Sequence, residues 1–127
     1  MDIEYRIEDN GMRIYTGPKG VLTIEQTLEY FKRLKNDTRI KQGALEIVDF
    51  KEVTDFKISY VESQRITRSY QEPKGIRMIR ATLFICESDL AYGVGRMLQT
   101  LHEITNSDHL VVLVRSGNEV ESVIRSL

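Results

Sequence analysis

Residues 79–104 read IRATLFICESDLAYGVGRMLQTLHEI, and this stretch decides the fold class of the chain. It begins with an apolar strand pattern over 78–86, in which alternate residues from Ile79 to Ile85 form one wholly apolar face. A polar break follows, and Ser88 within it is a suitable N-cap for a helix. Six apolar residues then recur at helical spacing: Leu90, Val94, Met97, Leu98, Leu101 and Ile104. A strand that runs directly into an amphipathic helix indicates an α/β protein.

Strand and helix patterns alternate over the rest of the chain as well. The alternating run at 3–8 and the turn residues Asp9-Asn10-Gly11 predict an N-terminal β-hairpin with its second strand at 12–16. The remaining patterns predict helices at 24–35, 57–71 and 120–127 and strands at 44–49 and 110–114, with capping boxes at Thr23/Gln26 and Ser116/Glu119. The order is a hairpin followed by α-β-α-β-α-β-α. We therefore expect a mixed sheet of about five strands with right-handed β-α crossovers.

The composition indicates a single cytoplasmic domain over residues 1–127. The 127 residues are 41% hydrophobic and 29% charged, which suits one buried core. The formal net charge of −1 gives no overall attraction for nucleic acid, and no apolar run reaches the roughly 18 residues of a membrane span. The single cysteine cannot form an internal disulfide, and the acidic N-terminus is unlike a signal peptide. We expect no nucleic-acid partner and no membrane span.

Three segments resemble the SpoIIAA-like group, relatives of the STAS domain of anti-sigma-factor antagonists and sulfate-transporter tails. They are ALEIVDFKEVTDF (44–56), IRATLFICESDLAYGVGRMLQTL (79–101) and LVVLVRSGNEVESVIRSL (110–127), together somewhat under half of the chain. The resemblance implies a right-handed β-α superhelix with a mixed sheet, and a bacterial signalling role. In signalling STAS domains a phosphorylatable serine follows an Asp at this loop. Here Phe56 follows Asp55, and Ser59 lies about one helical turn further on, so we expect no phospho-switch.

The first functional expectation is a non-catalytic regulatory or protein-binding module of STAS-like type. Open parallel sheets place binding sites at the strand carboxyl ends, so the candidate partner or ligand residues are Asp49, Lys51, Thr54, Asp55, Ser88, Tyr92, Gly93 and Arg96. The alternative is a binder or carrier of an apolar or lipid-like ligand, since some STAS-like folds resemble the lipid-carrying SEC14 group. Its pocket would lie between the strands and the helix that carries Tyr92, Gly93 and Met97.

Catalytic and metal-binding patterns are missing from the sequence, so we expect no enzyme activity, no metal and no cofactor. His102 and His109 lack further ligands nearby and are interpreted as surface or rim residues. Cys86 ends an apolar strand, which favours a buried, unreactive thiol. Gly93 and Gly95 lie inside a helix, where each costs about 1 kcal/mol relative to Ala, and this suggests close packing against an adjacent element or a partner subunit.

One strand face also suggests a contact surface. Arg80 on the central strand is predicted to pair with Glu46 across the sheet. If the helices gather on one side, the face that carries Met78, Arg80, Thr82 and Phe84 is the less covered one. A half-apolar face of this kind suggests a ligand contact or a homodimer interface.

Overall fold

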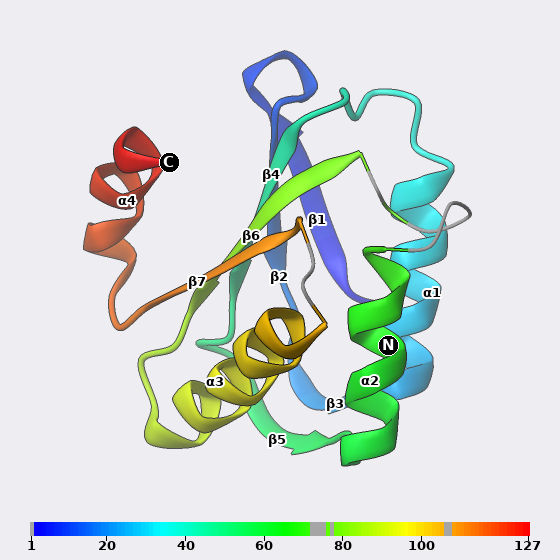
Figure 1. Cartoon of the computed structure of the whole chain (residues 1–127), viewed down its shortest axis with the longest axis vertical. Helices are drawn as coiled ribbons and strands as arrows, with labels where there is room; N and C mark the ends of the chain where they lie inside the picture. Colours follow the sequence, from blue (N-terminus) through cyan, green and yellow to red (C-terminus); the bar gives the residue numbers. More distant parts are fainter. Residues whose placement is uncertain (1, 72–75, 77, 106–107) are drawn as a thin grey trace.

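The computed structural model describes residues 2–71, 76, 78–105 and 108–127 and has an α/β fold (Figure 1). Its five-stranded sheet has the order β1 (Glu4–Glu8), β2 (Arg13–Gly17), β4 (Ala44–Asp49), β6 (Ile79–Ile85) and β7 (Leu110–Val114). Strands β1 and β2 are antiparallel, and the other neighbouring pairs are parallel. The expected α/β class and mixed five-stranded sheet are confirmed.

The N-terminal hairpin closes as its turn residues predict. Asn10 and Gly11 take φ values of 52° and 88°, and Asp9 takes 54°. A Cβ at Gly11 would lie 2.1 Å from Arg39 O, so this position requires glycine both for its backbone angle and for the close approach of the 39–41 loop. The alternating strand residues and the turn residues together therefore specify the β1–β2 hairpin.

A second, two-stranded sheet was not expected from the sequence. It pairs β3 (Gly20–Thr23) with β5 (Val53–Lys57) in parallel. Both strands are short, and β5 reads VTDFK, in which the charged residues hide any apolar pattern. The predicted order, a hairpin followed by α-β-α-β-α-β-α, therefore lacks β3 and β5. Its other helices and strands occur in the structure in the same order.

The helices begin at the N-caps that their sequences provide. Helix α1 (Ile24–Lys35) starts with the expected Thr23/Gln26 capping box, and α2 (Tyr60–Ser69) starts with a Ser59/Glu62 box inside the predicted range 57–71. Ser88 caps α3 (Asp89–Ile104) by accepting from Ala91 N. Helix α4 (Val120–Ser126) follows a 3-10 turn at Gly117–Glu119.

The Ser116/Glu119 capping box that we expected before α4 does not form. Ser116 Oγ accepts from Asn118 N instead, and the Glu119 carboxylate accepts from Arg115 N. The 3-10 turn at Gly117–Glu119 separates Ser116 from the first residue of α4, so Ser116 caps this turn and not the helix.

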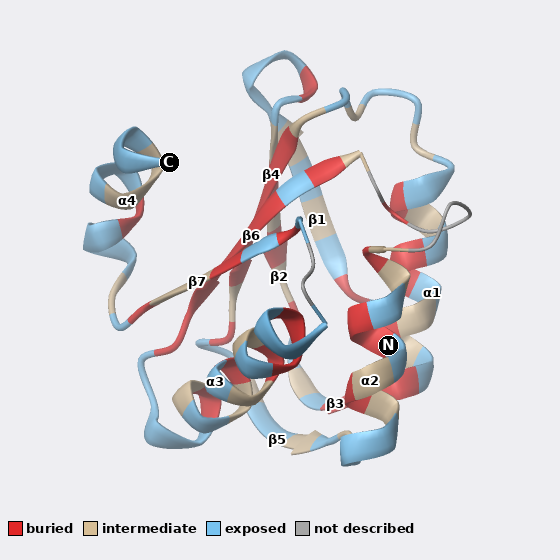
Figure 2. Ribbon diagram, viewed as in Figure 1, coloured by how far each residue is buried: buried red, intermediate tan, exposed pale blue. Residues whose placement is uncertain are grey.

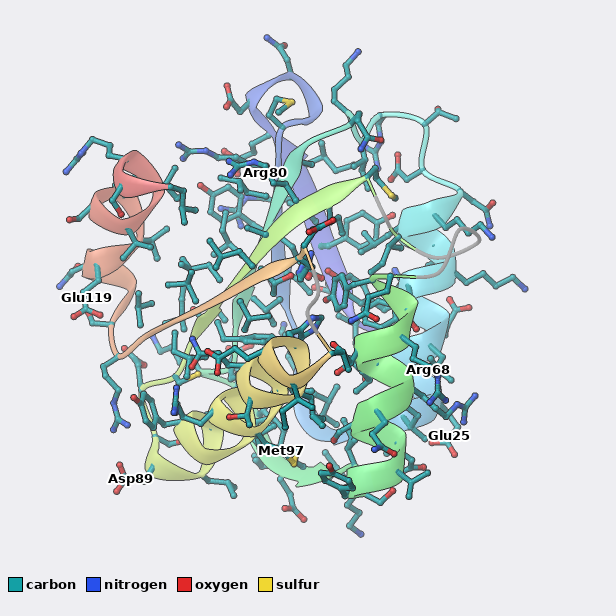
Figure 3. The ribbon with its side chains drawn as sticks, in the orientation of Figure 1. Glu25, Arg68, Arg80, Asp89, Met97 and Glu119 are labelled. Atoms are coloured by element: carbon teal, nitrogen blue, oxygen red, sulfur yellow. The ribbon has the colours of Figure 1, made fainter. Side chains whose placement is uncertain are left out.

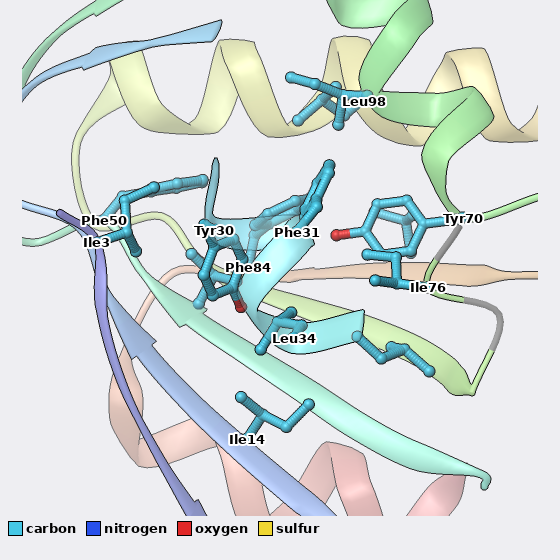
Figure 4. Close-up of a cluster of buried hydrophobic side chains, with 14 of the residues drawn as sticks. Ile3, Ile14, Tyr30, Phe31, Leu34, Phe50, Tyr70, Ile76, Phe84 and Leu98 are labelled. Carbon is cyan, nitrogen blue, oxygen red and sulfur yellow. The ribbon is translucent and has the colours of Figure 1, made fainter. Parts of the chain in front are cut away.

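Three helices cover one face of the five-stranded sheet and α4 covers the other (Figures 1 and 2). The larger core joins Val48 and Phe84 to Phe31 of α1, Ile66 of α2 and Leu98 of α3 (Figure 4). The smaller core joins a second set of strand residues to α4: Ile47, Leu83, Ile85 and Val114 pack with Val120, Val123 and Ile124.

The expectation about the less covered face is wrong. Thr82 and Phe84 are 1% and 7% exposed and lie on the side of the three helices, whereas α4 covers the Leu83 and Ile85 side. Strand alternation separates two faces but does not say which one the helices cover. Polar Thr82 is tolerated on the more deeply buried face because its hydroxyl is hydrogen-bonded there.

Candidate functional site

Glu46 lies at the centre of β4 with 1% of its surface exposed and is the hub of a buried hydrogen-bond network. Tyr30 donates to Glu46 Oε2 over 2.5 Å, and Tyr70 donates to Oε1 over 2.6 Å. Thr82 Oγ1 lies 2.7 Å from Oε1. Three hydroxyl groups therefore surround one carboxyl group in a water-poor layer between sheet and helices, where an unpaired carboxyl would be costly.

Three different elements bring these hydroxyl groups to Glu46. Tyr30 comes from the buried side of α1, Tyr70 directly follows α2, and Thr82 comes from β6. Figure 4 shows the Tyr30 and Tyr70 rings inside the larger core. Thr82 faces Glu46 because the β4–β6 register shifts after Ala44, which pairs Glu46 with Thr82.

The same register overturns the predicted Glu46–Arg80 pair. Ala44 faces Ile79 and Leu45 faces Ala81, so Arg80 is passed over at the irregularity. Arg80, labelled in Figure 3, is exposed, whereas Glu46 is buried. The sequence alone does not reveal the register of β4 and β6, which sets Thr82 rather than Arg80 opposite Glu46.

A second shell of polar side chains extends the network in both directions. Thr16 Oγ1 lies 2.6 Å from the Tyr30 hydroxyl. On the other side His109 Nε2 lies 2.7 Å from Thr82 Oγ1, and His109 Nδ1 lies 3.1 Å from Ile79 O. The His109 ring stacks on Tyr70 with 4.1 Å between ring centroids.

Both histidines are buried, so their interpretation as surface or rim residues is wrong. His102 is 4% exposed and His109 is 7% exposed. Their rings lie 5.2 Å apart, and His102 also contacts the Tyr70 ring at 5.4 Å. Both rings pack against Tyr70, and both ring nitrogens of His109 lie within hydrogen-bond distance of a partner. His102 Nδ1, in contrast, is buried without a hydrogen-bond partner among the described residues.

Burial controls the protonation of these groups. It raises the pKa of Glu46, an effect that the hydrogen bonds from Tyr30, Tyr70 and Thr82 partly offset. It lowers the pKa of both His102 and His109 to about 4. Within the described part of the chain, no lysine or arginine forms an ion pair with Glu46. Neutral side chains thus satisfy the carboxyl group.

An apolar cavity of about 50 Å³ adjoins the Glu46 hub, between the sheet and the three helices. Phe84 and Val48 bound it from the sheet, and Val94 and Leu98 bound it from α3. Glu46, Tyr30, Tyr70 and Thr16 also line it, and the remaining lining side chains are Ile3, Pro18, Leu22, Thr27, Phe31, Phe50, Phe56, Ile58 and Ile66. Glu46 is the one carboxyl group among these described lining residues.

The eight residues predicted from the sequence lie outside this cavity and are spread over several surfaces. Asp49 is half-buried at the end of β4 and accepts from Lys51 N over 2.9 Å, while Thr54 and Asp55 are exposed on β5. The other four lie at the start of α3 or on it: Ser88, Tyr92, Gly93 and Arg96. We expected an apolar cavity between the strands and the helix that carries Tyr92, Gly93 and Met97. The cavity adjoins this helix, but the helix residues that line it are Val94 and Leu98.

Several of these predicted residues have local structural roles. Ser88 caps α3, and the Tyr92 ring lies 4.7 Å below the guanidinium of Arg115. Arg115 also binds Asp89 over 2.9 Å. These contacts fix the loop between β7 and α4 to the start of α3.

The two glycines of α3 differ. A Cβ at Gly95 would lie 2.8 Å from Leu113 Cδ2 and 3.1 Å from Cys86 Sγ, so the predicted close packing is confirmed there. At Gly93 a Cβ would meet no atom within 4 Å, so no adjacent element packs closely there, and packing against a partner subunit stays a prediction for that residue. Cys86 itself is fully buried as expected, and burial raises the pKa of its thiol to about 11.

Phe56 and Ser59, the two residues compared above with the switch serine of STAS domains, have structural roles in this chain. The Phe56 ring packs edge-on against Phe50 with 5.2 Å between centroids. Ser59 accepts from Glu62 N and forms the capping box of α2. Phe56 has no hydroxyl group to be phosphorylated, and its ring lines the apolar cavity.

No protein-family model, curated protein or solved structure matches this chain. Among the helices of the described residues, none is long and apolar enough to cross a bilayer. The described residues also contain no group of three His, Cys, Asp or Glu side chains arranged to hold a metal ion.

Sequence reasoning missed the Glu46 hub. One signal was present, because Glu46 is the single interruption of the apolar strand ALEIVD. A charged residue inside a strand that is apolar on both faces needs buried partners. The tyrosines at 30 and 70 carried no comparable signal, since either could have been an ordinary core residue.

Proposed function

We propose that the chain is a non-catalytic binding module that holds a small apolar ligand in the cavity beside Glu46. The observation that carries the proposal is the lining of that cavity, which is almost wholly aliphatic and aromatic. The polar groups that reach it already bind one another, as Glu46 does with Tyr30 and Tyr70. A site of this kind offers contact area and shape but no uncommitted acid, base or nucleophile.

The size of the cavity limits the ligand. An engineered cavity of about 150 Å³ in another protein binds benzene or xenon and stays free of water. The cavity here, about 50 Å³, is smaller. It suits xenon or the branched end of a hydrocarbon, and benzene would require the side chains of α3 to move outward. We propose this ligand class in place of a complete lipid.

The architecture supports a SpoIIAA-like origin for this module. The hairpin, the β1-β2-β4-β6-β7 sheet and the alternation of helices and strands agree with the order that the sequence resemblance implies. Phe56 stands where a signalling relative would carry its serine, and its ring lines the cavity. We propose that this branch of the fold binds a ligand where its signalling relatives use a phosphate switch.

A titration with xenon and then benzene, followed by methyl NMR, tests the proposal. We expect saturable shifts of the Ile66 and Leu98 methyl groups, which line the cavity. Val94→Phe places a ring in the cavity and should abolish these shifts. Val123→Phe is the matched control, because Val123 packs in the smaller core next to α4 and should leave them intact. A wild-type protein whose cavity methyl groups do not respond to either probe would contradict the proposal.

Protein binding is the second candidate, favoured by three large apolar side chains that are exposed. Val21 on β3, and Tyr60 and Val61 at the start of α2, are 40%, 57% and 65% exposed. Val21 pairs with Asp55, one of the residues predicted for partner binding. A cluster of exposed apolar side chains often marks an interaction surface. A dimer at high micromolar concentration that Val61→Lys converts to a monomer would identify a second copy as the partner, whereas a monomeric wild type would exclude that copy.

A further inference from the structure

Thr82 stands between Glu46 and His109 and has one hydroxyl hydrogen for two close contacts. Its Oγ1 lies 2.7 Å from Glu46 Oε1 and 2.7 Å from His109 Nε2. Because a hydroxyl group donates one hydrogen bond, one of these two neighbours must donate its own hydrogen to Oγ1. His109 Nδ1 lies 3.1 Å from Ile79 O, and a backbone carbonyl only accepts, so Nδ1 already carries a hydrogen.

Two assignments of hydrogen atoms satisfy every one of these contacts. In the first, Glu46 is a carboxylic acid that donates to Thr82, and Thr82 donates to the bare Nε2 of a neutral His109. In the second, Glu46 is a carboxylate and His109 is an imidazolium. A carboxylate beside a neutral imidazole would leave one contact without a hydrogen. Glu46, Thr82 and His109 together therefore carry one proton more than a carboxylate, a hydroxyl group and a neutral imidazole would.

Burial selects the neutral assignment. Both assignments make the same hydrogen bonds, but the second places two ions in a layer where Glu46 and His109 are 1% and 7% exposed. Among the described residues, the titratable groups in contact with the pair are Tyr30 from α1, Tyr70 after α2 and His102 from α3. Burial raises the pKa of both tyrosines, which keep their hydroxyl hydrogens, and lowers the pKa of His102 to about 4. All three are therefore neutral at pH 7, and none compensates an ion. The raised pKa of Glu46 and the lowered pKa of His109 agree with this choice.

We infer that Glu46 is a neutral carboxylic acid in the folded protein, shares its proton with His109 through Thr82, and makes the cavity selective for neutral apolar ligands. The ligand part of this inference rests on the proposed function. His109 also lines an open pocket of about 410 Å³ together with Gln42 and Arg80. The chain from this pocket through His109 and Thr82 gives the buried carboxyl group a route for proton exchange with solvent.

Carbon-13 and nitrogen-15 NMR of the wild-type protein at pH 7 tests the protonation directly. We expect the Glu46 carboxyl carbon at the shift of a protonated acid, and His109 with hydrogen on Nδ1 alone. The signals are assigned by their loss or change in Glu46→Gln, with Glu103→Gln on the exposed side of α3 as the control. A carboxylate signal for Glu46 at pH 7 would overturn the inference, whichever form His109 takes.

Ligand selectivity gives the second test. Glu46→Gln can keep a donor for Thr82 and an acceptor for Tyr30 without a charge, so its benzene affinity should stay within about twofold of wild type. Benzylamine, an ammonium ion at pH 7, should cause no shift of the cavity methyl groups in either protein. Binding of benzylamine to wild type, abolished in Glu46→Gln, would reveal an ionised Glu46 and refute the inference. If neither benzene nor xenon binds, the proposed function fails while the NMR result for Glu46 still stands or falls by itself.

Discussion

Replacing each glycine of α3 by alanine should have opposite effects on stability. Gly93 and Gly95 lie two positions apart in the same helix, and glycine in a helix interior costs about 1 kcal/mol relative to alanine. At Gly93 the added methyl group meets no atom within 4 Å, so Gly93→Ala should gain that full amount. For a chain of this size this corresponds to a rise in Tm of about 4 °C.

At Gly95 the same gain is opposed by crowding. The new Cβ would lie 2.8 Å from Leu113 Cδ2 and 3.1 Å from Cys86 Sγ, and Cys86 is fully buried. Forcing an extra methyl group into a packed core typically costs about 1–3 kcal/mol. Subtracting the gain in helix propensity leaves a net effect between zero and a loss of about 2 kcal/mol. The two variants should thus differ by about 1–3 kcal/mol.

Urea denaturation followed by circular dichroism measures both variants against wild type at pH 7. Equal m values would show that the native states remain comparable. We expect the midpoint of Gly93→Ala above wild type and that of Gly95→Ala at or below it. A Gly95→Ala protein as stable as Gly93→Ala would refute the close contact between α3 and the β6–β7 side of the sheet.

Three further predictions concern the buried polar groups. Tyr70→Phe removes one hydrogen bond to Glu46 and should lower the free energy of unfolding by about 1 kcal/mol in urea denaturation, and no loss would contradict the bond. Burial lowers the pKa of His102 and His109 to about 4, so folding favours their neutral forms and the free energy of unfolding should fall as the pH drops from 6.5 towards 4. The raised pKa of Glu46 acts in the opposite direction, because folding favours its protonated form and that contribution is lost as the pH rises. A neutral Glu46 means that the folded chain holds about one proton more at this residue near pH 5.5 than the unfolded chain does. Glu46→Gln should therefore steepen the fall by about 1.4 kcal/mol per pH unit, and an unchanged slope would contradict a neutral Glu46. Cys86, with its pKa raised to about 11 and no exposed surface, should react with iodoacetamide at pH 8 at least about 100-fold more slowly than in the urea-unfolded chain, as mass spectrometry can follow; equal rates would contradict its burial.

Much of the fold follows from local patterns in the sequence. Helix α1 and strand β4 have the predicted bounds, and Ser88 caps α3 as expected. These elements are specified by residues close together in the chain: an N-cap, a periodic stripe or an apolar run. The small β3–β5 sheet was missed because its pairing joins short segments about thirty residues apart, and neither has a pattern of its own.

The candidate site depends on long-range placement, which the sequence does not display. Glu46 is recognisable as an unusual residue in an apolar strand, but its partner depends on the register shift after Ala44. That shift places Thr82, rather than Ala81, opposite Glu46, and Arg80 faces Glu46 in neither register. Tyr30 and Tyr70 reach the same carboxyl group from helices sixteen and twenty-four residues away. Local periodicity contains none of this information.

The residues predicted to bind a partner also show what the sequence does not reveal. Asp49 ends β4 and Ser88 comes after β6, where binding residues in open α/β sheets lie, whereas Asp55 lies within β5. In this chain the Asp49 carboxylate accepts a hydrogen bond from Lys51 N, and Ser88 caps the start of α3. Residue types that bind ligands also stabilise turns and helix starts, so position after a strand does not separate the two roles.

A crystal structure of the protein under xenon pressure tests the apolar ligand site most directly. We expect one xenon atom in the cavity between Phe84 and Leu98, within contact of Ile66, with the Glu46–Tyr30–Tyr70 hydrogen bonds unchanged. A cavity that stays empty of xenon, or that contains ordered water bound to Glu46, would contradict a dry apolar site and with it the proposed function.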